Sequence, residues 1–324
     1  MAIVVLGTGG TIASTVQADG RRRASLTAQQ LLSRVPTLRD RTDLRARDLH
    51  TINSWALDTT DMIALAERVR TELEAPDVDG VVLTHGTDTL EETAWLTDLW
   101  LGSSADEGGV VVTGAMRAAD ELSPDGDRNL DNAVRVAGSA LARGRGALVV
   151  LDDDVHAARE VTKVATDGIG ALRSPMGPCG RVDERSVAFL RDPSPRPLPG
   201  DRIEPRVAAF AVFPGMDGHV LLDAVARGAV GVALEGTGLG NVPPAVGGAV
   251  RELVADGVPV VIAARPRRGA TDLRYGGEGG GGTLLDDGAI PAGDLPLHKA
   301  RVALMVALGR DPSVAAVRTW FDRL

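Results

Sequence analysis

Two segments of the chain place threonines among glycines, each directly after a short apolar run. The first reads Gly7-Thr-Gly-Gly-Thr11-Ile-Ala13, and the second reads Thr84-His-Gly-Thr87-Asp88-Thr89. Glycines let the backbone approach a ligand closely and leave its N–H groups free to face an anion. A threonine hydroxyl becomes a nucleophile once a base removes its proton. The two segments are therefore candidate ligand-binding and catalytic loops.

The first segment is similar in spacing to the glycine-rich loop of dinucleotide-binding proteins, a different class of function. That loop needs glycine at its sixth position, where this chain has Ile12. It also needs an acidic residue about 20 residues further on, and residues 26–32 read LTAQQLL. The sequence therefore argues against a dehydrogenase. Taken alone, Thr11 is more simply explained as a turn hydroxyl.

The second segment combines a helix start with residues that a helix start does not require. Asp88 and Thr89 precede Glu91 and Glu92 at the spacing of a capping motif, so helix capping explains one of the two. That interpretation gives no structural reason for His85-Gly86-Thr87. The imidazole of His85 is a candidate base, although packing beside the strand end is the role that we favour.

Lys163, in the sequence Glu160-Val-Thr-Lys163, is a candidate for proton transfer. The chain has 35 basic residues, of which only Lys163 and Lys299 are lysines. A lysine can activate a hydroxyl if it loses its proton, whereas an arginine stays protonated. Lysine is therefore informative in a chain that otherwise uses arginine. An ordinary surface lysine remains the alternative, and Lys299 is expected to lie in an ordinary helix.

Short β-branched runs alternate with helical patterns along the chain. The runs are apolar at successive positions, which is typical of strands buried on both faces. Alternation of strand and helix predicts an α/β fold with a doubly wound, mostly parallel sheet. The predicted strands are Ile3–Leu6, Val81–Thr84, Val110–Thr113, Ala147–Leu151, Ala208–Phe213, Val230–Leu234 and Val258–Ala263.

Polar residues mark the ends of several predicted helices. Thr27 and Gln30 form a capping box, and residues 61–74 carry apolar side chains at helical spacing. A helix that begins at Asp88 or Thr89 is expected to stop at Gly102. The last helix is expected to start at Asp311-Pro312, with proline at its first position.

A proline-rich stretch divides the chain into two predicted domains. Residues 192–199 contain four prolines, which fit neither a helix nor a central strand. We therefore expect a larger N-terminal catalytic domain over residues 1–191, a linker over 192–205, and a smaller C-terminal α/β domain over 206–324.

Composition and charge exclude several partners. The formal net charge of −9 argues against a nucleic-acid binder, which needs a basic patch. The single Cys179 allows no internal disulfide, which fits a reducing compartment, and we expect it to be a small buried filler. The N-terminus does not read as a signal peptide, and no apolar run approaches the roughly 18 residues of a membrane span. We expect a cytoplasmic protein without a membrane partner.

Five motifs together resemble the bacterial L-asparaginase/glutaminase family, and their order and spacing match over nearly the whole chain. They are GTGGTIAST at 7–15, THGTDTLEET at 84–93, GAMR at 114–117, DG with NLxNA at 125–133, and EVTK at 160–163. The resemblance implies two domains, a homodimer or homotetramer, and a site completed between two chains. It implies no cofactor and no metal, and the five histidines show no ligand spacing.

The same resemblance assigns roles to individual residues. Thr11 would be the first nucleophile, with Thr87, Asp88 and Lys163 as the second catalytic group. Ser54 would bind the α-carboxylate of the substrate, Asp88 also its α-ammonium group, and Asn241 would complete the site of a neighbouring subunit. The remaining expected substrate contacts are Trp55, Gly86 and Ala115.

The activity that this resemblance implies is hydrolysis of L-asparagine to L-aspartate and ammonia. The alternatives are a glutaminase-asparaginase of mixed specificity, the amidase subunit of a tRNA-dependent amidotransferase and a non-catalytic amino-acid sensor. Ammonia release would separate the enzymes from the sensor.

The chain departs from the family in residues 14–30, which lack the usual loop tyrosine, and at Trp55, which stands where the family often has a small or polar residue. Tyr275 is the only tyrosine, and we expect the Asp88–Lys163 relay to work without it. Glu278, in the glycine-rich stretch that follows, is a further candidate for a neighbour's site.

Overall fold

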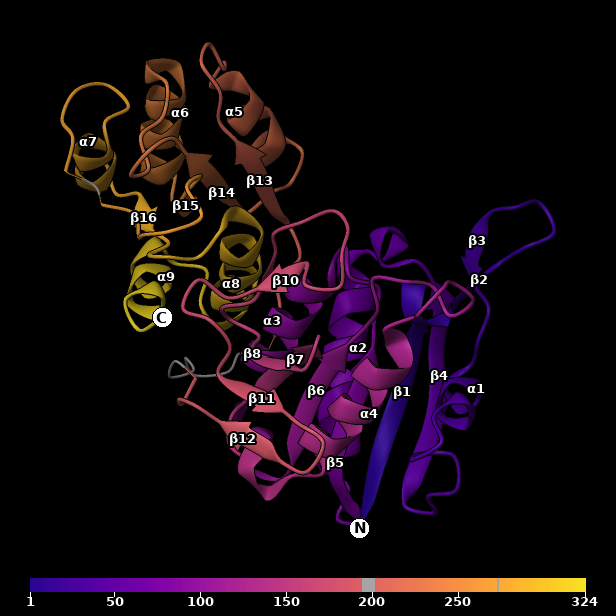
Figure 1. Cartoon of the computed structure of the whole chain (residues 1–324). Coiled ribbons are helices and arrows are strands. Elements are labelled where there is room, and N and C mark those ends of the chain that lie inside the picture. The colour runs from indigo at the N-terminus through magenta and orange to yellow at the C-terminus, as the bar shows by residue number, and fades with distance from the viewer. Residues whose placement is uncertain (194–201, 273) are drawn as a thin grey trace. The chain divides into compact units, whose positions relative to one another are not determined.

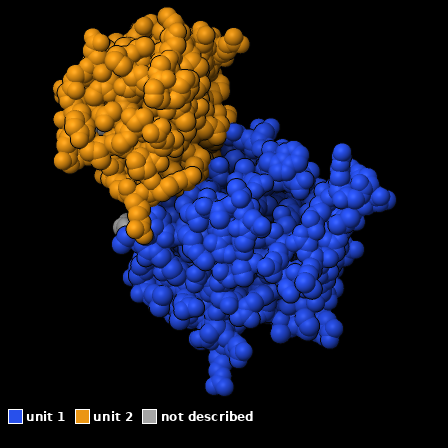
Figure 2. Space-filling view, turned by 45° about the horizontal axis from the view of Figure 1, so that its top comes forward, with its two compact units in different colours: residues 1–196 blue, residues 197–324 orange. Residues whose placement is uncertain are grey.

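The computed structural model describes residues 1–193, 202–272 and 274–324. The chain forms two compact units, Met1–Arg196 and Pro197–Leu324, which Figure 2 colours separately. Residues 194–201, which make up most of the predicted linker, lie outside the described residues. Each unit contains its own parallel sheet and helices, as the predicted α/β fold with two domains requires.

The first unit is built on a large, mostly parallel sheet (Figure 1) with the strand order β12-β11-β8-β7-β6-β5-β1-β4. Strands β4, β1, β5, β6 and β7 pair in parallel, whereas β8, β11 and β12 continue the sheet in antiparallel fashion. The strands are β1 (Ala2–Gly9), β4 (Leu44–Ile52), β5 (Val78–Thr84), β6 (Gly109–Thr113), β7 (Ala147–Leu151), β8 (Asp154–Ala157), β11 (Gly180–Val182) and β12 (Val187–Phe189).

Helices cover both faces of this sheet, which confirms the doubly wound prediction. Successive side chains of a strand point to opposite faces. Ile3 and Val5 accordingly join one buried cluster with α1 and α4, and Val4 and Leu6 join another with α2 and α3. These two clusters explain why the strands are apolar at every position. The helices are α1 (Ala28–Arg34), α2 (Thr59–Leu73), α3 (Leu90–Leu101) and α4 (Gly126–Ala137).

Short elements connect the sheet and helices of the first unit. The hairpin β2–β3 follows the first strand, and the pair β9–β10 carries Lys163. They are β2 (Ser14–Val16), β3 (Arg22–Ala24), β9 (Thr162–Lys163) and β10 (Leu172–Arg173), with the 3-10 turns η1 (Thr11–Ala13), η2 (Ser54–Ala56), η3 (Gly102–Asp106) and η4 (Ala140–Ala142).

The second unit is a smaller α/β layer with the parallel strand order β13-β14-β15-β16. Its strands are β13 (Val207–Ala211), β14 (Gly231–Gly236), β15 (Val260–Ala264) and β16 (Ile290–Pro291). Its helices are α5 (His219–Ala226), α6 (Pro244–Ala255), α7 (Gly281–Asp286), α8 (Leu297–Arg310) and α9 (Val314–Phe321). Lys299 lies in α8, as expected, but it is completely buried. No helix in the described part of the chain is long and apolar enough to cross a membrane.

Helix ends mostly follow their polar signals. The capping box of Thr27 and Gln30 is present at α1, and α3 ends at Gly102 with φ 56°. The predicted start of the last helix at Asp311-Pro312 is wrong. The helix α9 begins at Val314 because the Ser313 hydroxyl accepts a hydrogen bond from the backbone N–H of Ala316.

Candidate active site

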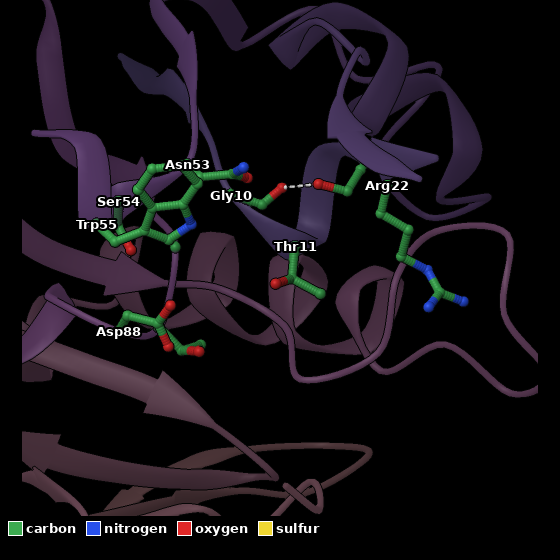
Figure 3. Close-up of a pocket in the computed structure, with 10 residues that line it drawn as sticks. Gly10, Thr11, Arg22, Asn53, Ser54, Trp55 and Asp88 are labelled. Carbon is green, nitrogen blue, oxygen red and sulfur yellow. Dashed lines mark hydrogen bonds between the residues drawn. The ribbon is translucent and has the colours of Figure 1, made fainter. Parts of the chain in front are cut away.

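A pocket of about 180 Å³ lies where β1, β4 and β5 end. Because these strands pair in parallel, their carboxyl ends meet at one edge of the sheet, where α/β proteins bind ligands. Figure 3 shows side chains from all three connections gathered there. The lining residues are Gly10, Thr11, Ser14, Arg22, Asn53, Ser54, Trp55, Gly86, Thr87 and Asp88.

The two threonine loops touch each other through glycine. The hydroxyl of Thr8, near the end of β1, donates to the carbonyl of Thr84 at the end of β5 at 2.8 Å. Gly10 has φ 76°, and a Cβ atom placed there would lie 2.5 Å from both N and Cα of Gly86. The glycines therefore let the loops that carry Thr11 and Thr87 lie against each other.

We expect Gly10→Ala to disrupt the pocket, with loss of most activity. The added Cβ meets backbone rather than a flexible side chain, so the free energy of unfolding should fall by about 3 kcal/mol or more. Gly20→Ala is the matched control, because Gly20 also has φ 76° but has no atom within 4 Å of the built Cβ. The control should lose about 1 kcal/mol and keep its activity. Urea denaturation and turnover measure both effects, and equal losses would show that the close approach is unimportant.

Lys163 joins Thr87 and Asp88 in one hydrogen-bonded group. Its Nζ donates to Thr87 Oγ1 at 2.9 Å and to Asp88 Oδ1 at 2.6 Å. The Lys163 side chain is only 16% exposed, so it is not a free surface lysine. Its backbone N–H donates to Glu91 Oε1 at 3.2 Å, which ties β9 to the first turn of α3.

Capping does not explain the polar side chains in front of α3. Thr89 is the N-cap residue, but its side chain makes no capping hydrogen bond. Its hydroxyl instead donates to the backbone carbonyl of Ser54 at 2.9 Å. A Cβ on Gly86 would lie 2.6 Å from Ser54 Oγ. The 84–89 loop thus holds the Ser54 segment against the pocket.

The other expected substrate contacts lie in different environments. Ser54 is buried and Trp55 is 69% exposed, and both line the pocket. Ala115 is completely buried and is not among the lining residues. Asn241 belongs to the second unit, where its Oδ1 accepts a hydrogen bond from the N–H of Gly281 at 3.0 Å. Tyr275, in the same unit, is 54% exposed.

His85 is packed behind the pocket, which is the role favoured from its position in the sequence. The side chain is completely buried, and its Nδ1 forms a 2.8 Å hydrogen bond with the carbonyl of Gly86. Nε2 has no hydrogen-bond partner among the described residues. Burial lowers the pKa of His85 from 6.5 to about 4. The imidazole is therefore neutral at pH 7 and does not line the pocket.

This lowered pKa predicts acid sensitivity. Between pH 6.5 and about 4, His85 binds a proton in the unfolded chain but not in the folded one. The free energy of unfolding is therefore unaffected by this proton above pH 6.5. Below pH 6.5 it falls as the pH falls, by up to about 3 kcal/mol. His85→Asn should remove that part of the pH dependence, whereas the exposed His219→Asn should leave it. Denaturation curves across this range measure the effect, and parallel pH profiles for the wild type and His85→Asn would contradict it.

The sequence interpretation missed several lining residues, of which Arg22 is the most distinctive. It lies on β3, within residues 14–30, where the family's loop tyrosine is absent. Gly10, Ser14 and Asn53 were also missed, although the first two lie within the recognised GTGGTIAST motif. The run Arg21-Arg22-Arg23 was the available signal, but nothing in the sequence shows which of the three side chains faces the pocket.

Cys179 is a buried filler, as expected. Its thiol donates to the carbonyl of Val155 at 3.2 Å, and burial raises its pKa to about 11. Among residues 1–193, 202–272 and 274–324, no cluster of three or more His, Cys, Asp or Glu side chains could hold a metal ion.

Comparison with known proteins gives matches over the whole chain. Residues 2–195 match the model of the asparaginase N-terminal domain, and residues 206–321 match that of the glutaminase/asparaginase C-terminal domain. A probable L-asparaginase of Deinococcus radiodurans is 38% identical over 99% of this chain and 97% of its own length. A glutaminase-asparaginase of Pseudomonas fluorescens biotype A is 34% identical over 94% of this chain and 86% of its own length. The crystal structure of a probable cytoplasmic L-asparaginase from Campylobacter jejuni superposes with a TM-score of 0.86 at 29% identity, covering 100% of this chain and 99% of that one.

Proposed function

Because the chain belongs to the asparaginase family, we propose that it hydrolyses the side-chain amide of L-asparagine to L-aspartate and ammonia. The observation that supports this most directly is the hydrogen-bonded group of Thr87, Asp88 and Lys163 in the pocket that Thr11 also lines. The mixed glutaminase activity is less favoured, because a probable L-asparaginase shares 38% identity with the chain and two glutaminase-asparaginases of Pseudomonas species share 34%.

In this proposal the pocket orients the amino acid by its charged end. Asp88 is the only acidic residue among the described lining residues, and it would bind the α-ammonium group. Ser54 would donate to the α-carboxylate. The side-chain amide then lies between Thr11 and Thr87, which come from loops in direct contact. In this proposal, backbone N–H groups near Thr11 or Thr87 stabilise the oxyanion that forms during the reaction.

The chemistry takes two steps. Thr11 Oγ forms a bond to the amide carbon, the carbon–nitrogen bond breaks, and ammonia leaves with the transferred proton. Water then cleaves the acyl-threonine ester to release aspartate. Lys163, when it is neutral, can accept a proton through Thr87 Oγ1, and Asp88 stabilises the resulting ammonium group.

A coupled ammonia assay tests the function directly. The purified protein should release ammonia from L-asparagine without added metal, and less from D-asparagine and L-glutamine. Binding of L-asparagine without ammonia release would show instead a non-catalytic sensor. Loss of activity with a chelator, restored by zinc, would contradict the threonine mechanism.

We also propose that residues 1–191 form the catalytic domain, that residues 206–324 form the second domain, and that the protein is a homodimer or homotetramer. The two compact units support this division, and in the proposed assembly Asn241 completes the site of a neighbouring subunit. Sedimentation during turnover tests the assembly, because an active monomer would refute it.

Cytoplasmic location is supported by the Campylobacter jejuni structure, although a Haemophilus influenzae relative is named periplasmic. Cell fractionation decides between the two compartments.

A further inference from the structure

Arg22 brings a positive charge to the pocket from the hairpin β2–β3. Strand β3 pairs with β2 so that Arg22 lies opposite Val16. Arg22 is the only cationic side chain among the described lining residues. Its Nη2 forms an ion pair with Glu121 Oε1 at 2.5 Å, and the Arg22 side chain is 47% exposed.

Backbone hydrogen bonds hold the hairpin in place independently of this ion pair. The N–H of Val16 donates to Asp120 Oδ2 at 2.6 Å. The N–H of Ala119 donates to the carbonyl of Ser14 at 3.1 Å. The position of the arginine at the pocket is therefore set by the fold as well as by Glu121.

Arg22 lies on the side of Thr11 away from the residues proposed to bind the amino acid. In Figure 3, Thr11 lies between Arg22 and the group formed by Ser54, Trp55 and Asp88. A substrate with its α-ammonium group at Asp88 and its side-chain amide at Thr11 extends toward Arg22 beyond the amide nitrogen. The ammonia released from asparagine has no carboxylate, so hydrolysis of asparagine does not need the positive charge of Arg22.

The arginine can bind a further carboxylate. A guanidinium group carries five N–H donors, and its planar arrangement suits carboxylates. Glu121 Oε1 forms an ion pair with Nη2 of Arg22, and partly exposed pairs of this kind contribute little to stability. A carboxylate on a substrate can therefore share the guanidinium or replace Glu121.

We propose that the same pocket hydrolyses β-aspartyl amino acids, in which the side-chain amide nitrogen of asparagine belongs to a second amino acid, and that Arg22 binds the carboxylate of that second residue. The proposal rests on the proposed function, because it uses the same threonine chemistry. Thr11 Oγ bonds to the carbonyl carbon, the amide carbon–nitrogen bond breaks, and the nitrogen takes a proton and leaves as the free amino acid. Water then cleaves the ester and releases aspartate.

A pair of matched substrates isolates the carboxylate. β-Aspartylglycine and β-aspartylglycinamide have the same shape, but only the first has a terminal negative charge. The wild type should cleave the acid with a kcat/KM about tenfold higher than the amide, the effect of one charge-assisted hydrogen bond. Arg22→Gln should abolish this preference. Arg21→Gln, a neighbouring exposed arginine that does not line the pocket, should keep it, and Glu121→Gln should increase it.

L-Asparagine, measured in the same series, separates the two proposals. Ammonia from asparagine without cleavage of either dipeptide would overturn this inference and leave the proposed function intact. Equal kcat/KM values for acid and amide, or a preference that survives in Arg22→Gln, would also overturn it. An inactive wild type on asparagine refutes the proposed function, and an acid preference that depends on Arg22 would then support the dipeptide activity by itself.

Discussion

Thr11→Ala and Thr87→Ala should each reduce the turnover of L-asparagine roughly a thousandfold or more, because removal of a catalytic nucleophile or of its proton relay has effects of that size or larger. Both side chains line the pocket, and Thr87 Oγ1 is the atom to which Lys163 donates. Neither is a large core group, so the free energy of unfolding should change by only about 1 kcal/mol. Turnover and urea denaturation measure the two effects separately.

Two comparisons make this prediction specific. Thr11→Ser and Thr87→Ser keep a hydroxyl and should retain far more activity than the alanine variants. The turnover of the double alanine variant should be hardly lower than that of the less active single variant, because the effects of residues that act in one step are not additive. If either alanine variant keeps more than about a tenth of the activity, that threonine is not a nucleophile or relay group.

Much of the fold could be predicted from the sequence because its central strands carry two hydrophobic faces. Val81 to Thr84 is apolar up to its last position, since Val81 and Leu83 pack in one cluster and Val82 in the other. Strand β4 was missed for the opposite reason. It lies at the end of the sheet order, and its residues are only partly buried, so no continuous apolar run marks it.

Part of the pocket lining was predictable where the sequence contains polar residues that the fold does not need. Capping leaves Thr87 and His85 unexplained, and Thr87 indeed lines the pocket. His85 is completely buried and is needed for packing, the role favoured from its position beside the strand end. Arg22 was not predictable, because its position depends on hydrogen bonds from the β2–β3 hairpin to residues 119 and 120 and on an ion pair with Glu121, about a hundred positions further along the chain.

Lys163→Arg should be nearly as damaging as Lys163→Met. In the proposed relay, Lys163 must be able to lose and regain a proton, and a guanidinium group does not lose its proton in proteins. Arginine would keep the ion pair with Asp88, which Lys163 makes at 2.6 Å, but not the exchange with Thr87. Both variants should therefore turn over L-asparagine at least about a hundredfold more slowly than the wild type.

A substitution on β10 controls for disturbance of the β9–β10 strand pair, which carries Lys163. Arg173 lies on β10, opposite Thr162 on β9, and forms partly exposed ion pairs with Asp152 and Asp154. Arg173→Lys makes the reverse exchange outside the pocket and should leave turnover nearly unchanged. Circular dichroism and denaturation would confirm that all three variants are folded. A Lys163→Arg enzyme with wild-type turnover would mean that the lysine supplies only a fixed charge to Asp88, so that Thr87 must pass its proton to another group.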